Sequence, residues 1–442
     1  RGMSNANRLL GERLGARASK EYVGETGGQI GITLANFVAE RITRGEVRLA
    51  LLAGSNNMRT IARAQREGFE LDWTTGGEGT PEQVGEFKPG NSKLEREYGL
   101  QMPPDIYPIF ENALRARRGL TIEENRERMG RLMSPFTEVA AANPYAWFPT
   151  YRSPEELTTV SPQNRMIAFP YPKYLNAVLQ TDQAAGLILC SVAAARAHGI
   201  PEDRWVYWWG GAQTQEEAWW ASERPDFAQC PALLDSTSAA LENAEVSLDD
   251  VDKIDFYSCF PVAIGMACEM LGIDESDPRG FTVTGGLPYA GGPASAYCLH
   301  SLASMVERLR GDAGTNGLVT GNGWYLTKHA ASLWSTERKP GELPRGEVPA
   351  RRASAERGLK TAPATLAEAP EGKGVVEAYT VVYDREGAPE RGIVLGQTAD
   401  DKRFLANTPG DRSLLEDFVN IEEIGREGKL SVREGKTVFE PA

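Results

Sequence analysis

The sequence predicts a layered α/β fold that ends in a small β-rich unit. Residues 31–42 place apolar side chains at a period close to 3.6, which indicates a buried helix, and the apolar run at 47–53 is typical of a strand buried on both faces. Strand-like and helix-like segments alternate between residues 184 and 321, an order typical of α/β layers. From residue 375 onward, short strand-like runs separated by turn residues predict a small barrel such as an OB-fold.

The composition is ordinary for a soluble globular protein. The chain has 442 residues, 41% of them hydrophobic, and its length suits about three domains of ~150 residues each. Its 48 basic and 61 acidic residues give a net charge of −13, which argues against a nucleic-acid partner. No run approaches the ~18 apolar residues of a membrane span, and the first residues do not resemble a signal peptide. The five cysteines form no CxxC pair, so the cytoplasm is the expected location.

Several common enzyme motifs are missing from the sequence. There are only three histidines, with no HExxH and no Cys/His ligand spacing, so no metal site is expected. The chain also lacks a GxxxxGK[ST] phosphate loop, a GxGxxG after a strand and a GxSxG element. We therefore expect no tightly bound cofactor.

The remaining elements are expected as follows along the chain. Residues 68–170, rich in Pro, Gly and charge, are expected to form a long insertion over the core, with helices at 94–98, 105–117 and 122–139. In the alternating region we expect strands at 184–191, within 250–256 and at 317–321. The strand at 317–321 is expected to be the final core strand. Helices are expected at 192–198, 225–244, 261–271 and 294–310. The tail strands are expected at 375–383, 392–396, 402–405 and 430–432.

Six segments match the motifs of a known family in their order and spacing. They read NPYAWF at 143–148, DQAAGLILCS at 182–191, DFYSCF at 255–260, TGGL and GGP within 284–293, GLVTGNG at 317–323, and the stretch from Gly45 to Gly54 followed by Met58. Residues 20–330 thereby resemble the thiolase superfamily, nearest the sterol-carrier-type thiolases and the thiolase-like proteins of type 1. The tail resembles the additional small β domain of the type 1 proteins.

The resemblance implies a thiolase-like layered fold of two related α/β halves. The N-terminal half would comprise residues 1–67 and 171–183, interrupted by the insertion at 68–170, and the C-terminal half would comprise residues 184–334. A Pro-rich linker at 335–373 and a small OB-like β domain at 374–442 would follow. Thiolases begin with an apolar strand that nothing before Gly31 supplies, so we expect Arg1 to mark a truncated start.

The resemblance also implies that four mechanistic positions of thiolases are replaced in this chain. The nucleophilic Cys at the start of the buried helix corresponds to Gly28, flanked by Gly27 and Gln29. The activating His, the acid/base Cys and the His or Asn of the strand-turn correspond to Gly292, Asn322 and Tyr257, in that order. Claisen chemistry through an acyl-enzyme needs the first nucleophile, so ordinary thiolysis is not expected.

Three residues are candidates for catalysis. Tyr257 would act as a general acid or as a hydrogen-bond donor to an acyl carbonyl, although a plain structural role fits equally well. Asn322 would donate to a carbonyl or enolate oxygen, against the alternative of a turn residue in the left-handed conformation. His329, expected in a loop beside Lys328, would titrate near neutral pH, against the alternative of a surface pair.

Five residues are candidates for binding a coenzyme A thioester. Gly27 and Gly28 would leave room and N–H donors at a helix N-terminus, unless they only allow close packing. Gly286, Tyr289 and Gly292 belong to the Gly-rich loop that resembles the NPSGG…GHP stretch of thiolases, and a structural role is the default for Tyr289.

The resemblance leaves three functions open. The first is acyl-CoA binding by a protein that resembles acetyl-CoA acetyltransferases of lipid metabolism but lacks their cysteines. The second is retro-aldol cleavage of a β-hydroxyacyl-CoA, such as a sterol side-chain thioester, with Tyr257 or Tyr289 as acid/base and the β domain in place of an OB-fold partner. The third is a non-catalytic scaffold subunit. Either a homodimer through the core or a monomer is expected.

Overall fold

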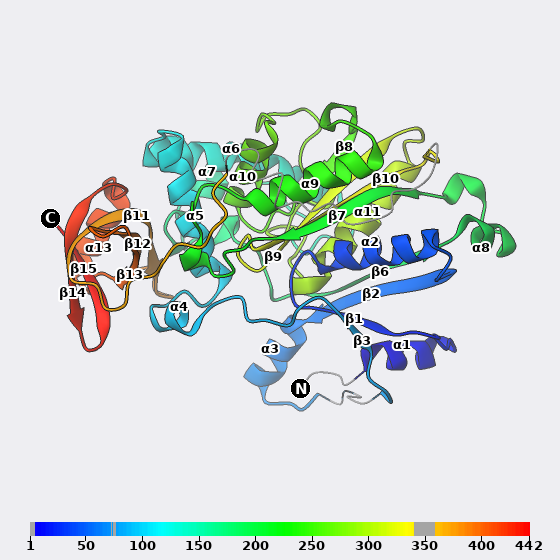
Figure 1. Ribbon diagram of the computed structural model, residues 1–442, viewed down its shortest axis with the longest axis horizontal. Coiled ribbons are helices and arrows are strands. Elements are labelled where there is room, and N and C mark those ends of the chain that lie inside the picture. The colour runs from blue at the N-terminus through cyan, green and yellow to red at the C-terminus, as the bar shows by residue number, and fades with distance from the viewer. Residues whose placement is uncertain (1–4, 72, 74–76, 340–358) are drawn as a thin grey trace.

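The computed structural model describes residues 5–71, 73, 77–339 and 359–442 of the chain. An α/β core occupies most of the molecule, and a small barrel lies at one end of its long axis (Figure 1). Of the linker expected at 335–373, residues 340–358 lie outside the described part.

The core is centred on a four-stranded sheet in the order β7-β10-β9-β8. Its strands are β7 (Tyr207–Gln215), β8 (Lys253–Asp255), β9 (Asn316–Gly323) and β10 (Lys328–Ser335). β10 is antiparallel to both of its neighbours, and its register sets His329 opposite Asn322 of β9. The prediction that the final core strand lies at 317–321 is wrong, because β10 follows it. β10 begins with Lys328 and His329, and these polar residues obscured a fully buried strand.

Two helices lie between this sheet and a second, two-stranded ladder (Figure 1). They are α2 (Ile30–Thr43) and α11 (Tyr297–Arg310). α2 forms where the 3.6 period predicted it and buries Ile32, Ala35 and Val38. Its buried Asn36 donates to the Ala331 carbonyl of β10 (3.1 Å), which fixes the helix on the sheet. On the opposite face of the sheet lies α9 (Pro231–Ala244), and α10 (Pro261–Leu271) packs against α9.

The second ladder corrects the prediction of a strand buried on both faces. It pairs β2 (Leu49–Asn57) with β6 (Asp182–Cys190) in antiparallel register. α2 and α11 cover only one face of this ladder, so alternate side chains on the other face contact solvent. Leu51 is 44% exposed and Ile188 is 67% exposed. A continuous apolar run therefore did not indicate burial on both faces here.

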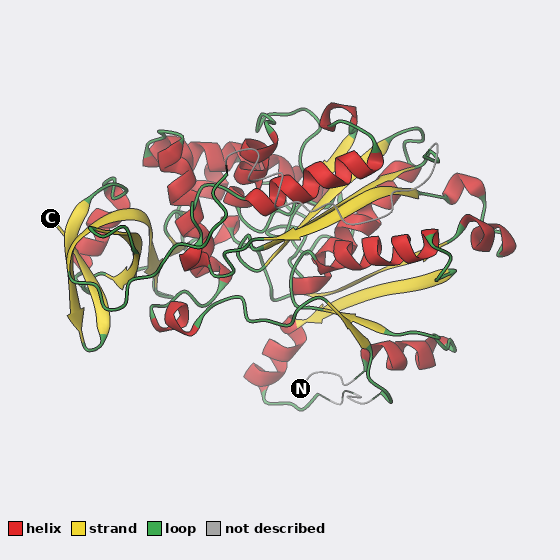
Figure 2. Ribbon diagram, in the orientation of Figure 1, coloured by secondary structure: helices red, strands yellow, loops and turns green. Residues whose placement is uncertain are grey.

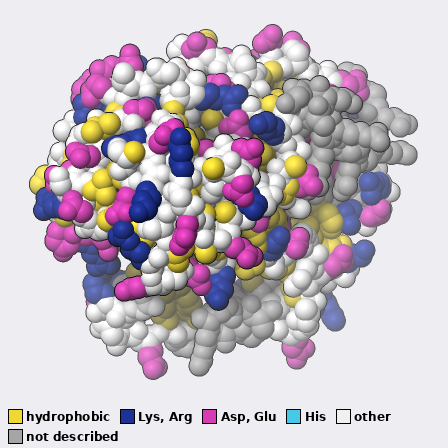
Figure 3. Space-filling view, turned by 60° about the vertical axis from the view of Figure 1, so that its left-hand side comes forward, with side chains coloured by type: hydrophobic (Ala, Val, Ile, Leu, Met, Phe, Trp, Pro, Cys, Tyr) yellow, Lys and Arg dark blue, Asp and Glu magenta, His cyan; other side chains and the backbone are white. Residues whose placement is uncertain are grey.

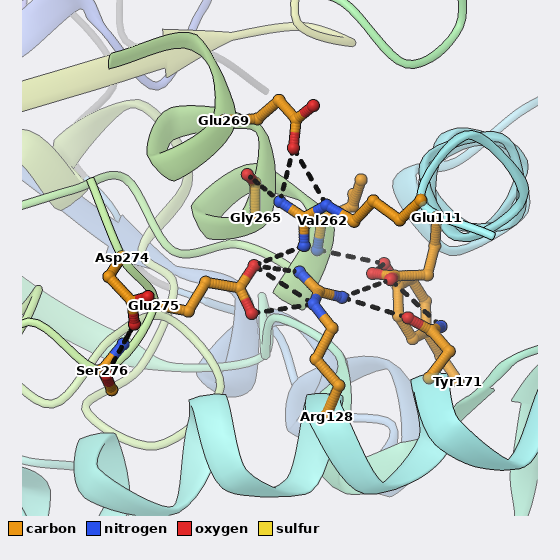
Figure 4. Close-up of polar contacts among 11 residues, drawn as sticks. Glu111, Arg128, Tyr171, Val262, Gly265, Glu269, Asp274, Glu275 and Ser276 are labelled. Carbon is orange, nitrogen blue, oxygen red and sulfur yellow. Dashed lines mark hydrogen bonds and ion pairs between the residues drawn. The ribbon is translucent and has the colours of Figure 1, made fainter. Parts of the chain in front are cut away.

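The insertion is helical and packs on α10 and on the barrel. Its helices are α4 (Lys93–Glu97), α5 (Pro103–Arg117), α6 (Ile122–Ala142) and α7 (Pro154–Thr158). A buried ion-pair network joins α5 and α6 to the loop after α10 (Figure 4). In it, Arg128 bonds to Glu111 at 2.9 Å and to Glu275 at 2.6 Å. Glu111 also accepts from the Tyr171 hydroxyl at 2.7 Å, so both of its oxygens are used.

The C-terminal unit is a closed five-stranded barrel (Figure 2). The predicted small barrel is thereby confirmed, with a fifth strand at Lys436–Pro441 that was not predicted. Its strands are β11 (Gly372–Tyr383), β12 (Pro389–Thr398), β13 (Arg403–Asn407), β14 (Glu427–Arg433) and β15 (Lys436–Pro441). They close in the order β11-β12-β13-β15-β14-β11, with helix α13 (Arg412–Asn420) between β13 and β14. The short strands β4 (Met166–Ala168) and β5 (Tyr171–Pro172) extend the sheet beside β11.

The remaining elements lie near the N-terminus and on the surface. They are α1 (Ala6–Leu14), β1 (Tyr22–Gly24), α3 (Met58–Glu67), β3 (Glu82–Val84) and α8 (Val192–Ala197). Acidic and basic side chains are interspersed on the face shown in Figure 3. Among the described residues, every helix is too short or too polar to cross a bilayer.

Candidate functional site

Gly28 lies at the start of α2, against the end of β9. A Cβ atom at this position would overlap the Tyr257 hydroxyl oxygen and the backbone carbonyl oxygen of Asn322. The Tyr257 phenol therefore occupies the space that any side chain at position 28 would need. The neighbouring Gly27 N–H donates to the Ser295 hydroxyl (3.2 Å), so this donor is already used within the protein.

The three candidate catalytic residues line one small internal cavity. Tyr257, Asn322 and His329 all contribute to its wall, although they come from three different segments of the chain. Its volume of about 10 Å³ is roughly that of one water molecule. Gly286, Tyr289 and Gly292 do not line this cavity. Within the described chain, no three His, Cys, Asp or Glu side chains are grouped as metal ligands.

Asn322 lies within β9 and is 3% exposed, so the alternative of a left-handed turn residue is wrong. Its amide nitrogen donates to the Tyr107 hydroxyl at 2.8 Å. That hydroxyl donates in turn to the Trp324 carbonyl at 2.9 Å, and the Tyr107 ring stacks on Phe260. Tyr107 is a member of the site that the sequence did not reveal. Its apolar surroundings in α5 indicate a core residue and give no sign that its hydroxyl reaches β9.

His329 does not lie in a surface loop, and the predictions of its environment and its titration are both wrong. It is 2% exposed within β10, and its Nε2 lies 3.1 Å from the Cys230 sulfur. Burial and the nearby Arg224 guanidinium lower the pKa of His329 to about 3. The imidazole is therefore neutral at physiological pH. Lys328 is also buried and bonds to the Glu25 carboxylate (2.9 Å).

Tyr257 is half-buried, with its ring edge-on to Tyr297 at a centroid distance of 5.4 Å. Burial and the neighbouring Cys259 raise the pKa of Tyr257 well above its usual value, so its hydroxyl stays protonated. Burial likewise raises the pKa of the Cys259 thiol to about 12. A thiol with such a pKa is a poor nucleophile at neutral pH, because the thiolate is the reactive form. The site thus presents a phenol as a hydrogen-bond donor and no thiolate.

The Gly-rich loop lies beside the NPYAWF segment. The N–H groups of Trp147 and Phe148 donate to the carbonyls of Ala290 (3.0 Å) and Tyr289 (2.9 Å). Gly286 lies against the Ser258 side chain, next to Tyr257 in sequence. Tyr289 is 3% exposed, and the Gly292 N–H donates to the Val178 carbonyl at 2.9 Å. The Gly-rich loop therefore packs against the strand-turn that holds Tyr257. The role of this loop in ligand binding stays a prediction.

Two comparisons identify the family. Residues 359–436 match the family described as thiolase-like protein type 1 additional C-terminal domain. Nearly the whole chain is similar to the crystal structure of a monomeric SCP2-thiolase like protein type 1 from Mycobacterium smegmatis. The identity is 33% and the TM-score 0.84, over 99% of this chain and 88% of that one. This chain belongs to the thiolase-like protein type 1 family.

Two solved structures of lower identity share the fold of this thiolase-like protein, and one further protein is similar to part of its sequence. The dimeric peroxisomal thiolase of Saccharomyces cerevisiae has 14% identity and a TM-score of 0.50, over 71% of this chain and 75% of that one. An acetyl-CoA acetyltransferase from Syntrophomonas wolfei has 16% identity and a TM-score of 0.52, over 75% and 83%. An acetyl-CoA acetyltransferase of Methanothermobacter thermautotrophicus is 27% identical over 239 residues. That match covers 51% of this chain and 59% of the relative's length.

The buried histidine makes the stability of this thiolase-like protein depend on pH. Because the folded pKa of His329 is about 3, the unfolded chain binds a proton below its usual pKa of 6.5 that the folded chain does not. The free energy of unfolding should therefore fall as pH drops, by about 1.2 kcal/mol between pH 6 and 5 from this group. Urea unfolding at both pH values measures the loss, which His329→Gln should remove. His198→Gln, at an exposed position, is the matched control, and an equal slope in all three proteins would contradict the prediction.

Proposed function

We propose that this thiolase-like protein binds acyl-CoA thioesters without forming a covalent acyl-enzyme. The observation that supports this most directly is the environment of Gly28. A side chain there would overlap both Tyr257 and the Asn322 backbone, so the start of α2 has neither a nucleophile nor the space for one. The similarity to acetyl-CoA acetyltransferases supports a coenzyme A thioester as the ligand class.

The cysteines near the site do not replace the missing nucleophile in this proposal. Cys259 is 5% exposed, and burial raises its pKa to about 12. Cys230, beside His329, is fully buried, and burial raises its pKa to about 12 as well. Covalent acyl transfer needs an accessible nucleophile that an adjacent group activates, and neither thiol meets that condition.

Calorimetry tests the binding directly. Titration with coenzyme A and with acetyl-CoA should give saturable binding, and acetoacetyl-CoA with coenzyme A should show no thiolysis. An absence of binding at millimolar ligand would instead support the scaffold function. Thiolysis at a normal turnover would overturn the proposed absence of covalent chemistry.

A second candidate function is retro-aldol cleavage of a β-hydroxyacyl-CoA. It is favoured by the Tyr257 hydroxyl, which lies at the start of α2 in place of a nucleophile and keeps its proton because its pKa is raised. A protonated phenol suits the step in which an acid protonates the developing enolate carbon. Product analysis should show a carbonyl compound and a shortened acyl-CoA. An unchanged rate in Tyr257→Phe would remove the acid role from Tyr257.

We also propose a fold type for the barrel and an assembly state for the protein. The barrel's strand order, with one helix between its third and fourth strands, supports an OB-type fold. The relative from Mycobacterium smegmatis is described as monomeric, and we propose the same state here. Light scattering after size-exclusion chromatography should give the mass of one chain, and twice that mass would favour the dimer.

A further inference from the structure

The loop between β9 and β10 has an unfavourable backbone. Trp324 and Leu326 adopt φ angles of +54° and +61°, in the left-handed region that bulky L-residues rarely occupy. Such conformations persist only where the surrounding structure holds them, and they occur most often at functional sites. This loop directly connects Asn322 to His329, two residues of the cavity wall.

Two buried donors hold the carbonyl groups of these strained residues. Tyr107 of α5 donates to the Trp324 carbonyl at 2.9 Å. The Arg224 guanidinium donates to the Leu326 carbonyl at 3.0 Å. Arg224 is itself 2% exposed, and its other terminal nitrogen donates to the Gln229 carbonyl at 2.7 Å. The geometry of the loop therefore depends on the positions of Tyr107 and Arg224.

The barrel bonds to the segments that hold both donors. Arg403 of β13, 6% exposed, donates to the backbone carbonyls of Arg224 and of Ser222, the latter at 3.4 Å. Its guanidinium lies 4.3 Å from the Phe227 ring centre and pairs with Glu377 of β11 at 2.9 Å. On α5, Asn112 donates to the Tyr379 carbonyl of β11 at 2.9 Å. β13 lies on the side of the barrel that faces the core (Figure 1).

We propose that the C-terminal barrel positions the 324–327 loop of the site, and that Arg403 is its principal positioning residue. Through Arg224, Arg403 fixes the Leu326 carbonyl and thereby the conformation of the loop that joins the strands of Asn322 and His329. Arg403 touches neither the cavity nor any ligand placed there, so it acts only through Arg224 and the loop. The effect on ligand affinity rests on the proposed function, whereas the effect on the loop does not.

The test replaces Arg403 by methionine, which keeps an apolar stem and removes the donors. Arg433→Met is the matched control, because Arg433 is a 54% exposed barrel arginine paired with Glu440. The proteins are labelled with 5-fluorotryptophan, and Trp324→Phe assigns the Trp324 fluorine resonance. Trp324 lies in the loop itself and the barrel strands contain no tryptophan, so a change in the Trp324 resonance reports a change in the loop. Coenzyme A affinity is measured on the same proteins by calorimetry.

We expect Arg403→Met to shift or broaden the Trp324 resonance and to weaken coenzyme A binding by ~3- to 30-fold, with partial recovery in Arg403→Lys. Arg433→Met should match the wild type in both readouts. A lower melting temperature with an unchanged Trp324 resonance would overturn the inference and leave Arg403 with a structural role only. If the wild type binds no coenzyme A, the proposed function fails, and the Trp324 resonance still decides the positioning role.

Discussion

Replacing Arg128 by methionine is expected to lower the free energy of unfolding by about 3–5 kcal/mol. Arg128 lies between Glu111, whose side chain is 0% exposed, and Glu275, whose side chain is 22% exposed. Burial alone would raise the pKa of Glu275, and the ion pairs with Arg128 and Arg118 hold it below the usual value. Without Arg128, Glu111 would remain as a buried carboxylate whose donors, among the described residues, are the Tyr171 hydroxyl and the Asn125 amide. The loss comes mainly from this uncompensated charge.

Equilibrium urea unfolding at pH 7 measures this effect. Arg131→Met is the matched control on the same helix, because Arg131 is 64% exposed and pairs with the surface residue Glu127. We expect the control to change stability by less than about 0.5 kcal/mol. Equal losses of unfolding free energy in the two variants would show that the buried ion-pair network contributes no more stability than a surface ion pair. The part of the loss that comes from the Arg128–Glu275 ion pair should disappear at acid pH, because protonation of Glu275 abolishes that ion pair in the wild type.

Gly28→Ala is expected to destabilise the protein by about 3 kcal/mol, near the upper end of the usual cost of overpacking. Of the three nearest atoms that the new methyl group meets, two lie at the far end of the Tyr257 side chain, but the third is the Asn322 backbone carbonyl oxygen within β9. The backbone cannot withdraw without disturbing the sheet. Gly28→Cys should cost at least as much and should not create thiolase activity, because its sulfur would have no room beside Tyr257.

A double-variant cycle separates the two sources of this clash. Tyr257→Ala should recover part of the loss in Gly28→Ala but not all of it, because the Asn322 carbonyl remains. Gly410→Ala is the control, since a Cβ at Gly410 meets nothing within 4 Å. Thermal unfolding of the single variants, the double variant and the control measures the stability change of each substitution and the coupling between the two positions. Strictly additive effects of Gly28→Ala and Tyr257→Ala would contradict the close packing of these two residues.

Local patterns predicted those elements whose burial is uniform along one face. α10 spans the expected 261–271, and four of the five barrel strands overlap their predicted ranges, because apolar period and turn residues are local properties. β10 was not predicted, since Lys328 and His329 are polar and find their partners only in the folded protein, at Glu25 and Cys230. β2 was predicted as a strand with the wrong burial, because the number of layers that cover a sheet is not local information.

The candidate site could be predicted only in part. The resemblance to thiolases pointed to Gly28, Tyr257 and Asn322, and the structure brings these three residues into contact distance. It did not point to Tyr107 or Arg224, which reach the loop after β9 from the insertion and from a segment before α9. Hydrogen bonds between residues about 100 to 217 positions apart leave no spacing for a sequence pattern to detect.

We propose that this thiolase-like protein binds acyl-CoA without covalent acyl transfer. Intact-protein mass spectrometry after incubation with acetyl-CoA and acetoacetyl-CoA tests it most directly, on a sample whose binding has been measured by calorimetry. We predict saturable binding together with an unmodified protein mass. An acetyl adduct on a cysteine, formed at a rate comparable to thiolase turnover, would contradict the proposed absence of covalent acyl transfer.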